Sequence, residues 1–138
     1  MTRQQVVDSI ADSIATMEGF YKAGTLPQKN ANPGDIRIWK DKMGPYPQSD
    51  GYVDFNAWAV TRGQSGEQAG VNEGWRVLKV LVGNYIDGKY TKSDPTFVEM
   101  FSVYAPSSDA NNPNAYAEYV AKQIGADPNQ TISSLITD

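Results

Sequence analysis

Apolar residues recur at three- and four-residue steps along much of the chain, and this spacing predicts amphipathic helices. The first helix is expected to end on Glu18, because Gly19 is a natural C-terminal stop. Its apolar side carries Val6, Val7, Ile10, Ile14 and Met17. Further helices are expected over Glu73–Tyr85, after the Ser93–Pro95 start as far as Pro106, from Asn112-Pro113 to Gly125, and as a short turn after Asp127-Pro128.

Two short segments after the first helix alternate as strands do. In Asp35–Trp39 the residues Ile36 and Ile38 share one face, and Gly51–Phe55 is the natural return strand. Tyr21–Pro33 is expected to be a loop, and Ala57–Asn72 is ambiguous between packing and a flexible connection. The pattern therefore predicts an α+β, mainly α fold with one small hairpin after the first helix, in a single domain over residues 1–138.

Composition narrows the class of protein. The chain has 138 residues, of which 40% are hydrophobic and 20% charged, as is usual for a globular domain. Its net charge of −4 argues against a nucleic-acid binder. No stretch approaches the roughly 20 apolar residues of a membrane span, so no membrane insertion is expected. Residues 1–12 lack the apolar centre of a signal peptide, so an exported destination would need release or delivery by another route.

The chain contains no cysteine and no histidine. This excludes thiolate nucleophiles, Ser-His-Asp triads and H-E-x-x-H metal sites. Acid–base chemistry must therefore use carboxylates, tyrosines or lysines. The segment Asp109–Asn114 superficially resembles a calcium loop, but it fails the EF-hand pattern at Pro113, Asn114 and Val120. No metal and no other cofactor is expected.

Glu18 is the first candidate for chemistry. A carboxylate in the last turn of a helix sits at the negative end of the helix dipole, which disfavours its ionised form. Phe20 and Tyr21 follow at once, and apolar neighbours act in the same direction by desolvation. A carboxyl group that keeps its proton is what a general acid for glycosidic-bond cleavage requires. The plain alternative is a solvated surface glutamate, because glutamate is rarely buried.

The residues around and after Glu18 resemble a known family. M-E-G-F-Y at residues 17–21 and L-P-Q-K-N-A-N-P-G-D-I-R-I-W at residues 26–39 resemble a glutamate–glycine pair followed by an NNPGN(L/I)R signature. That signature is typical of a phage and bacterial peptidoglycan-degrading family in the lysozyme-like superfamily, which includes lytic transglycosylases and endo-β-N-acetylglucosaminidases. Similar landmarks continue in G-Y-V-D-F, G-W-R-V-L, F-S-V-Y-A-P-S-S-D and N-A-Y-A-E-Y-V, so the resemblance covers residues 10–124. Ala31 and Asp35 depart from it, because the family commonly has asparagines there.

The resemblance implies a lysozyme-like fold in which Glu18 is the catalytic acid and faces the hairpin across a sugar-binding cleft. It implies that Tyr104 lines this cleft, with Tyr116 as a weaker second candidate; the alternative for Tyr104 is a structural hydroxyl. The other candidate residues lie in the loop and the expected hairpin. A structural turn is the alternative for Asn32 and Gly34, and a surface position is the alternative for Arg37. Asp35 and Asp54 are the carboxylates of the expected hairpin, and either would assist as base or electrostatic partner, with Asp54 as the possible second carboxylate.

The resulting hypothesis is an enzyme that cleaves the β-1,4 glycan backbone of peptidoglycan at the cell wall. Its partners would be glycan strands, and a monomer is the expected state. A lytic transglycosylase is preferred over a muramidase, because Glu18 has no equally persuasive carboxylate partner. Two alternatives stay open: a non-catalytic oligosaccharide-binding module or virion structural protein with the same fold, and an endo-β-N-acetylglucosaminidase.

Overall fold

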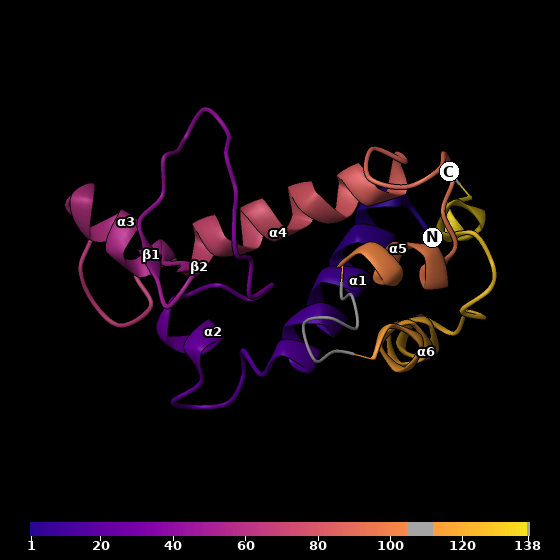
Figure 1. The fold of residues 1–138 in the computed structure, drawn as a ribbon, viewed down its shortest axis with the longest axis horizontal. Helices are drawn as coiled ribbons and strands as arrows, with labels where there is room; N and C mark the ends of the chain where they lie inside the picture. The colour runs from indigo at the N-terminus through magenta and orange to yellow at the C-terminus, as the bar shows by residue number, and fades with distance from the viewer. Residues whose placement is uncertain (105–111, 138) are drawn as a thin grey trace. The chain divides into compact units, whose positions relative to one another are not determined.

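The computed structural model describes residues 1–104 and 112–137. Within these residues the chain forms six α-helices, one two-stranded hairpin and a 3-10 turn (Figure 1). The predicted mainly helical α+β class, with its hairpin after the first helix, is therefore confirmed. In chain order the elements are α1 (Arg3–Glu18), α2 (Leu26–Lys29), β1 (Gln48–Ser49), β2 (Tyr52–Val53), α3 (Phe55–Thr61), α4 (Val71–Ile86), α5 (Phe97–Tyr104), α6 (Pro113–Ile124) and η2 (Ile132–Leu135).

Residue contacts divide the chain into two compact units. The terminal unit comprises residues 1–13 and 80–138, and the central unit comprises residues 14–79. Helices α1 and α4 each contribute one end to each unit. The prediction of a single domain stays a prediction, and each unit is described by itself.

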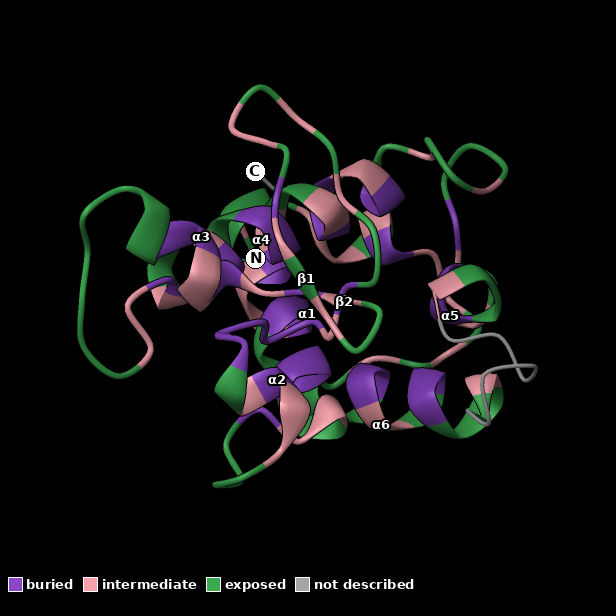
Figure 2. Cartoon of the chain, turned by 60° about the vertical axis from the view of Figure 1, so that its left-hand side comes forward, coloured by how far each residue is buried: buried purple, intermediate pink, exposed green. Residues whose placement is uncertain are grey.

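The terminal unit buries apolar faces of all its helices. Phe101 on α5 stacks on Tyr116 of α6, with ring centroids 4.7 Å apart. Helix α6 buries one face and exposes the other, as its periodicity predicts (Figure 2). The amino group of Met1 donates to the Leu135 carbonyl at 3.1 Å, so the two ends of the chain lie side by side (Figure 1). The fully buried apolar side chains of this unit include Val6, Ile10, Val82, Phe97, Met100, Phe101 and Ile132.

The ends of α6 agree with their sequence signals. The Asn112 side chain accepts a hydrogen bond from the Ala115 amide at 3.1 Å, and Gly125 ends the helix in the left-handed conformation. Helix α5 begins at Phe97, because Thr96 and Glu99 cap it reciprocally rather than Ser93 or Asp94. The predicted end of this helix at Pro106 lies outside the described residues.

The hairpin of the central unit differs from the predicted one. Its strands pair Gln48 with Val53 across a two-residue turn in which Asp50 and Gly51 both have positive φ, which is a type I′ geometry. The predicted return strand is therefore right only in Tyr52–Val53. The predicted strand Asp35–Trp39 is wrong, since Asp35 has a φ of 48°. That segment reaches the hairpin through one ladder-like bond, from the Val53 amide to the Ile36 carbonyl at 2.9 Å.

Three further expectations change in the central unit. The ambiguous Ala57–Asn72 segment begins inside a helix, α3, which buries Trp58 and Ala59. The predicted loop Tyr21–Pro33 contains the short helix α2, capped by the Thr25 hydroxyl. Met17 does not belong to the buried stripe of α1, because 40% of it is exposed.

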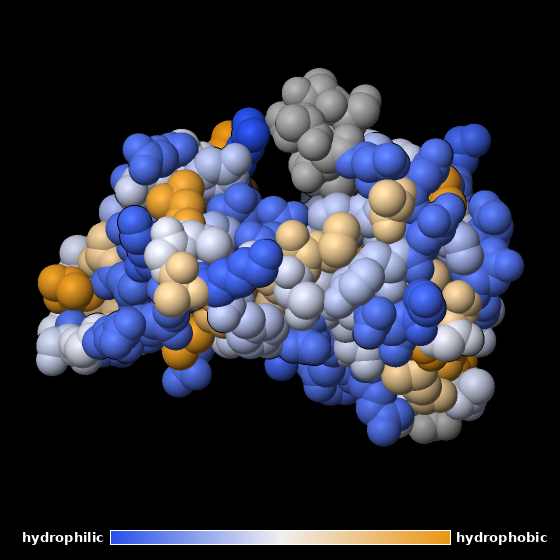
Figure 3. Space-filling view, turned by 90° about the horizontal axis from the view of Figure 1, so that it is seen from below, coloured by the Kyte–Doolittle hydropathy of each residue, from blue (hydrophilic) through white to orange (hydrophobic). Residues whose placement is uncertain are grey.

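Polar residues predominate on the molecular face in Figure 3, and hydrophobic residues occur there as separate small patches. Scattered exposed apolar side chains of this kind are normal for folded domains. Across the described part of the chain, every helix is too short or too polar to cross a bilayer.

Candidate functional site

Glu18 is held at the last residue of α1. The Phe20 amide donates to the Ala15 carbonyl at 3.0 Å, and the Gly19 amide donates to the Thr16 carbonyl at 3.2 Å. With Gly19 at a φ of 81°, these bonds form a Schellman motif, which ends a helix at a defined residue. The predicted helix end is therefore confirmed. Glu18 is half-buried there, beside the last carbonyl groups of the helix.

Asn32 fastens the loop after α2 to the hairpin. Its fully buried side chain donates to the carbonyls of Ile36 and Val53 at 2.9 and 3.0 Å, and accepts from the Ile36 amide at 3.0 Å. Both amide hydrogens are thus used by the fold. A role of Asn32 in binding substrate stays a prediction, and its observed contacts are those of a structural residue.

The loop adopts an unusual backbone at Ala31 and Asp35. Their φ angles are 51° and 48°, in the left-handed region that asparagine tolerates better than most residues. These are the two positions at which the family signature commonly has asparagine. Gly34, between them, is buried. The loop also lies directly on α4, because a Cβ at Gly74 would come within 2.1 Å of the Ala31 carbonyl oxygen.

The structure brings Glu18 and Asp35 close together. Burial, and after it the negative charge of Glu18, raise the pKa of Asp35 from its ordinary 3.8 to about 6, against the opposing charge of Arg37. The Oδ1 atom of Asp35 is buried and has no hydrogen-bond partner among the described residues. Asp35 is thus a carboxyl group whose proton the fold retains at unusually high pH.

Arg37 lies in the irregular segment before the hairpin and contacts Tyr52 of β2. Its guanidinium donates to the Tyr52 hydroxyl at 3.2 Å and sits 5.2 Å from the centre of the Tyr52 ring. The residue is exposed, so the surface alternative describes its position, while its charge also acts on Asp35. Arg37 therefore borders the Glu18–Asp35 pair, and binding of substrate by it stays a prediction.

Asp54 does not lie within a strand as expected. It follows β2 and caps α3, where its Oδ1 atom accepts a hydrogen bond from the Ala57 amide at 2.9 Å. An N-cap carboxylate satisfies an otherwise unpaired helix donor. The geometry therefore gives Asp54 a structural task, and its role as a second carboxylate stays a prediction.

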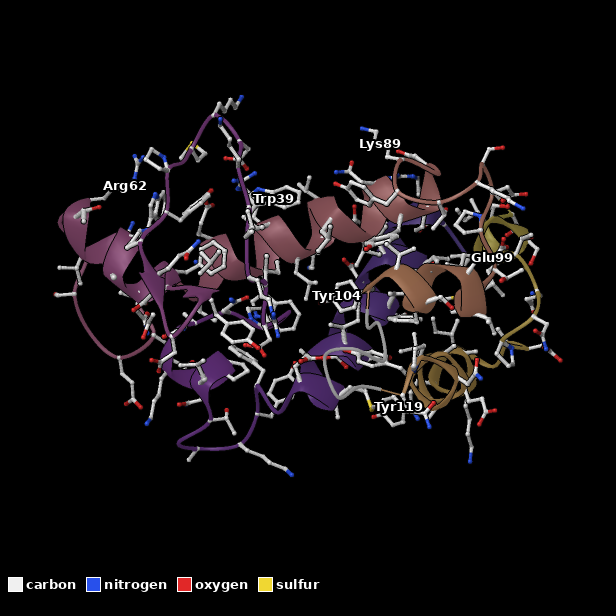
Figure 4. The ribbon with its side chains drawn as sticks, viewed as in Figure 1. Trp39, Arg62, Lys89, Glu99, Tyr104 and Tyr119 are labelled. Atoms are coloured by element: carbon white, nitrogen blue, oxygen red, sulfur yellow. The ribbon has the colours of Figure 1, made fainter. Side chains whose placement is uncertain are left out.

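Tyr104 and Tyr116 belong to the terminal unit. Tyr116 is 2% exposed and contacts the Tyr104 ring at 6.1 Å between centroids, in addition to its stack on Phe101. Tyr104, the last residue of α5 (Figure 4), also contacts Tyr85 at 6.0 Å. Both tyrosines are parts of an aromatic cluster in this unit. Their proximity to Glu18 stays a prediction.

Sequence reasoning missed a second charged group in the central unit, here called the Arg76 cluster and made of Asp41, Tyr46, Glu73 and Arg76. Arg76 donates to Glu73 from Nε at 2.7 Å and to Asp41 from Nη2 at 2.9 Å. The Tyr46 hydroxyl donates to Glu73 Oε2 at 2.6 Å. These bonds fasten the segment that contains Asp41 and Tyr46 to the first turns of α4.

The hydrogen bonds of the Arg76 cluster lower the pKa of its two carboxylates, Asp41 and Glu73. Burial opposes ionisation of Asp41, but hydrogen bonds from the Trp39 indole and from Arg76 lower its pKa to about 2 (Figure 4 labels Trp39). The hydrogen bond from Arg76 likewise lowers the pKa of Glu73. Burial, together with Glu73, raises the pKa of Tyr46. The cluster thus holds its acids ionised and fully bonded.

Only part of this cluster has a signal in the sequence. Glu73 and Arg76 stand three positions apart on a predicted helix, which is the spacing of a helical ion pair. Asp41 and Tyr46 come from an irregular segment far away in the chain, and no local pattern connects them with α4. Among residues 1–104 and 112–137, no three acidic side chains group in a way that could hold a metal ion; residues 109–111 of the Asp109–Asn114 segment lie outside that range.

No protein-family model, curated protein or solved structure matches the chain. The signature residues and the geometry around Glu18 are therefore the features that point to an activity.

Proposed function

We propose that this protein cleaves the β-1,4 glycan backbone of peptidoglycan, with Glu18 as the general acid. The observation that carries the proposal is the pairing of Glu18, fixed at the end of α1, with the half-buried Asp35. Two neighbouring carboxyl groups in unlike surroundings are the usual equipment for cleaving a glycosidic bond. The resemblance of residues 17–39 to a peptidoglycan-degrading family supplies the substrate class.

Asp35 would assist Glu18 through its charge. Repulsion between two carboxylates is mutual, so an ionised Asp35 disfavours a second negative charge on Glu18. The charge of Glu18 in turn helps to raise the pKa of Asp35, so the pair as a whole holds one proton until the pH rises through about 6. Asp35 would then help to keep a proton at the pair, without itself attacking the sugar.

A lytic transglycosylase is the preferred outcome. In that reaction the substrate's own muramyl C6 hydroxyl attacks the anomeric carbon, so no activated water is needed. Glu18 protonates the leaving oxygen and afterwards accepts the hydroxyl proton, and a 1,6-anhydromuramyl end forms. Asp54 caps α3 by accepting a hydrogen bond from the Ala57 amide. This supports a reaction in which Glu18 is the only catalytic acid and Asp54 is not a second carboxylate.

A muramidase is the second candidate, and the unpartnered Oδ1 of Asp35 favours it. In a hydrolase Asp35 would act as the second carboxylate, either as nucleophile or as base for a water molecule. Replacing Asp35 by asparagine separates the two reactions. A transglycosylase should lose only the assistance that Asp35 gives to Glu18, whereas a hydrolase that uses Asp35 as nucleophile or base should lose its activity.

The proposal is tested on purified cell walls with Glu18→Gln, which keeps the shape of the side chain but cannot donate an acidic proton. Glu67→Gln is the matched control, because Glu67 is exposed in the same unit. We expect the rate of wall solubilisation to fall roughly 10²–10⁴-fold in the first variant and to be unchanged in the second. Wild-type protein that binds walls without solubilising them would favour the non-catalytic module instead.

A further inference from the structure

A pocket of about 270 Å³ lies in the central unit. Its walls come from α3, from the segment that follows α3, and from the first turns of α4. Its lining includes Trp58, Gln64, Asn72, Glu73 and Arg76. Neither Glu18 nor Asp35 lines it.

Three hydrogen-bonding groups of this pocket have no partner among the described residues. The side-chain amides of Gln64 and Asn72 make no hydrogen bond there, and Arg76 uses Nε and Nη2 in its cluster but not Nη1. Two side-chain amides and one half of a guanidinium therefore offer both donors and acceptors to an occupant.

The charge of the pocket selects a neutral occupant. The carboxylates of Glu73 and Asp41 balance two guanidinium groups, that of Arg76 and that of Arg62 over the Trp58 ring, so net charge attracts neither an anion nor a cation. A cation would have to compete with Arg76, because both oxygens of Glu73 already accept hydrogen bonds from Arg76 or Tyr46. The remaining chemistry is that of an uncharged molecule rich in hydroxyl or amide groups.

Trp58 supplies a rigid aromatic wall. Its indole N–H donates to the Met43 carbonyl at 3.2 Å, and the Arg62 guanidinium lies 4.4 Å from the centre of its ring. Figure 4 labels Arg62 near α3. An aromatic wall beside polar amides suits a molecule with both C–H and hydroxyl surfaces. The volume is close to the lower end, about 300 Å³, of the usual range for small-molecule sites, which allows one ring rather than several.

The helix geometry separates this pocket from the Glu18 side of the unit. Gly74 of α4 faces the loop at Ala31, where a Cβ would collide with the carbonyl oxygen. Glu73 and Arg76 stand three positions apart and so share one face of α4, which differs from the face of Gly74.

We infer that this pocket binds one neutral sugar unit, at a site separate from the Glu18–Asp35 pair. The inference goes beyond the proposed function and does not depend on it, since it rests on the lining groups alone. If the protein acts on glycans, such a site would hold a strand without taking part in its cleavage.

The test is an NMR titration of the ¹⁵N-labelled full chain with N-acetylglucosamine, a monosaccharide that offers no glycosidic bond to cleave. We expect saturable shifts of the Gly70 backbone amide and of the Gln64 and Asn72 side-chain amides. Asn72→Ala and Gln64→Ala should each weaken binding roughly threefold to tenfold, as loss of one hydrogen bond does. Both residues are exposed, so the fold should survive, and Gln123→Ala on α6 is the matched control.

Three results would overturn the inference. They are the absence of saturable shifts at these amides, affinity that is unchanged in both pocket variants, and stronger binding of acetate than of the sugar at the same amides. Because the readout is binding, each of these results leaves the activity of Glu18 to be judged separately.

Discussion

Asp35 and Asp41 lie in the same unit and are both partly shielded from solvent, yet their pKa values move in opposite directions. Burial and the charge of Glu18 raise the pKa of Asp35 to about 6, whereas hydrogen bonds from Trp39 and Arg76 outweigh burial and lower the pKa of Asp41 to about 2. Asp41 also accepts from the Met43 amide at 2.7 Å. The partners of each carboxylate, rather than its burial, decide its charge.

This difference separates a structural region from a reactive one. Carboxylates of the Arg76 cluster have their oxygens bonded, so they stabilise the fold and have little capacity left for chemistry. Asp35 keeps an unbonded buried oxygen beside Glu18, which costs stability when Asp35 is ionised. Such local cost is common at functional sites, where pKa values are shifted for a reaction.

Removal of the cation from the Arg76 cluster should have the largest effect on stability. In Arg76→Ala the carboxylates of Asp41 and Glu73 lose their common partner, and we expect the free energy of unfolding to fall by about 2 kcal/mol. That is less than for a fully buried pair, because 41% of the Arg76 side chain is exposed. Urea denaturation at pH 7 measures it. Arg76→Lys keeps the positive charge but not the guanidinium geometry that bonds two carboxylates at once, so it should lose less stability than Arg76→Ala. Equal stability of the wild type and both variants would refute a structural role of the cluster.

Asp35→Asn should change stability in the opposite direction. The raised pKa means that the folded protein holds the Asp35 proton more tightly than the unfolded chain, so this stabilisation is complete below pH 3.8 and is lost as the pH rises through about 6. Asparagine is uncharged and tolerates the left-handed backbone. We expect a gain of about 1 kcal/mol at pH 7.5, after allowance for solvent screening, and none below pH 4. Thermal unfolding across this pH range measures it, and a gain of equal size at both ends would contradict the assigned shift.

Asp54→Asn should have the smallest effect. Asparagine caps a helix about as well as aspartate, so stability should change by only a few tenths of a kcal/mol, while Asp54→Ala should lose about 1 kcal/mol. Wall solubilisation by Asp54→Asn should remain close to that of the wild type. A well-folded but inactive Asp54→Asn protein would make Asp54 the second carboxylate after all.

Local signals predicted much of the fold. Gly19 and Gly125 end helices where expected, and Asn112 caps α6 through its side chain. These features depend on a few neighbouring residues, and the sequence carries them in full. The Asp50-Gly51 turn had an equally local signal, because Asp-Gly is typical of a type I′ hairpin. The alternation of Ile36 and Ile38 instead predicts a strand over Asp35–Trp39. The structure has none there, and Ile38 is 79% exposed.

The candidate site could be predicted only in part. The position of Glu18 follows from the end of α1, and the signature residues point to the loop that carries Asp35. The contrast between Asp35 and Asp41 could not be predicted, because the bond from Arg76 to Asp41 joins segments distant in the chain. The capping role of Asp54 has a local signal, since aspartate is a favoured N-cap residue, but the alternation in Gly51–Phe55 predicts a strand there instead.

The most direct test of the central claim is mass spectrometry of the soluble material released from purified peptidoglycan. The wild-type protein should release glycan fragments that end in 1,6-anhydromuramic acid, and Glu18→Gln at the same concentration should release almost none. Equal amounts of the same fragments from both proteins would show that Glu18 is not the acid, and no fragments from the folded wild type would contradict the proposed activity itself.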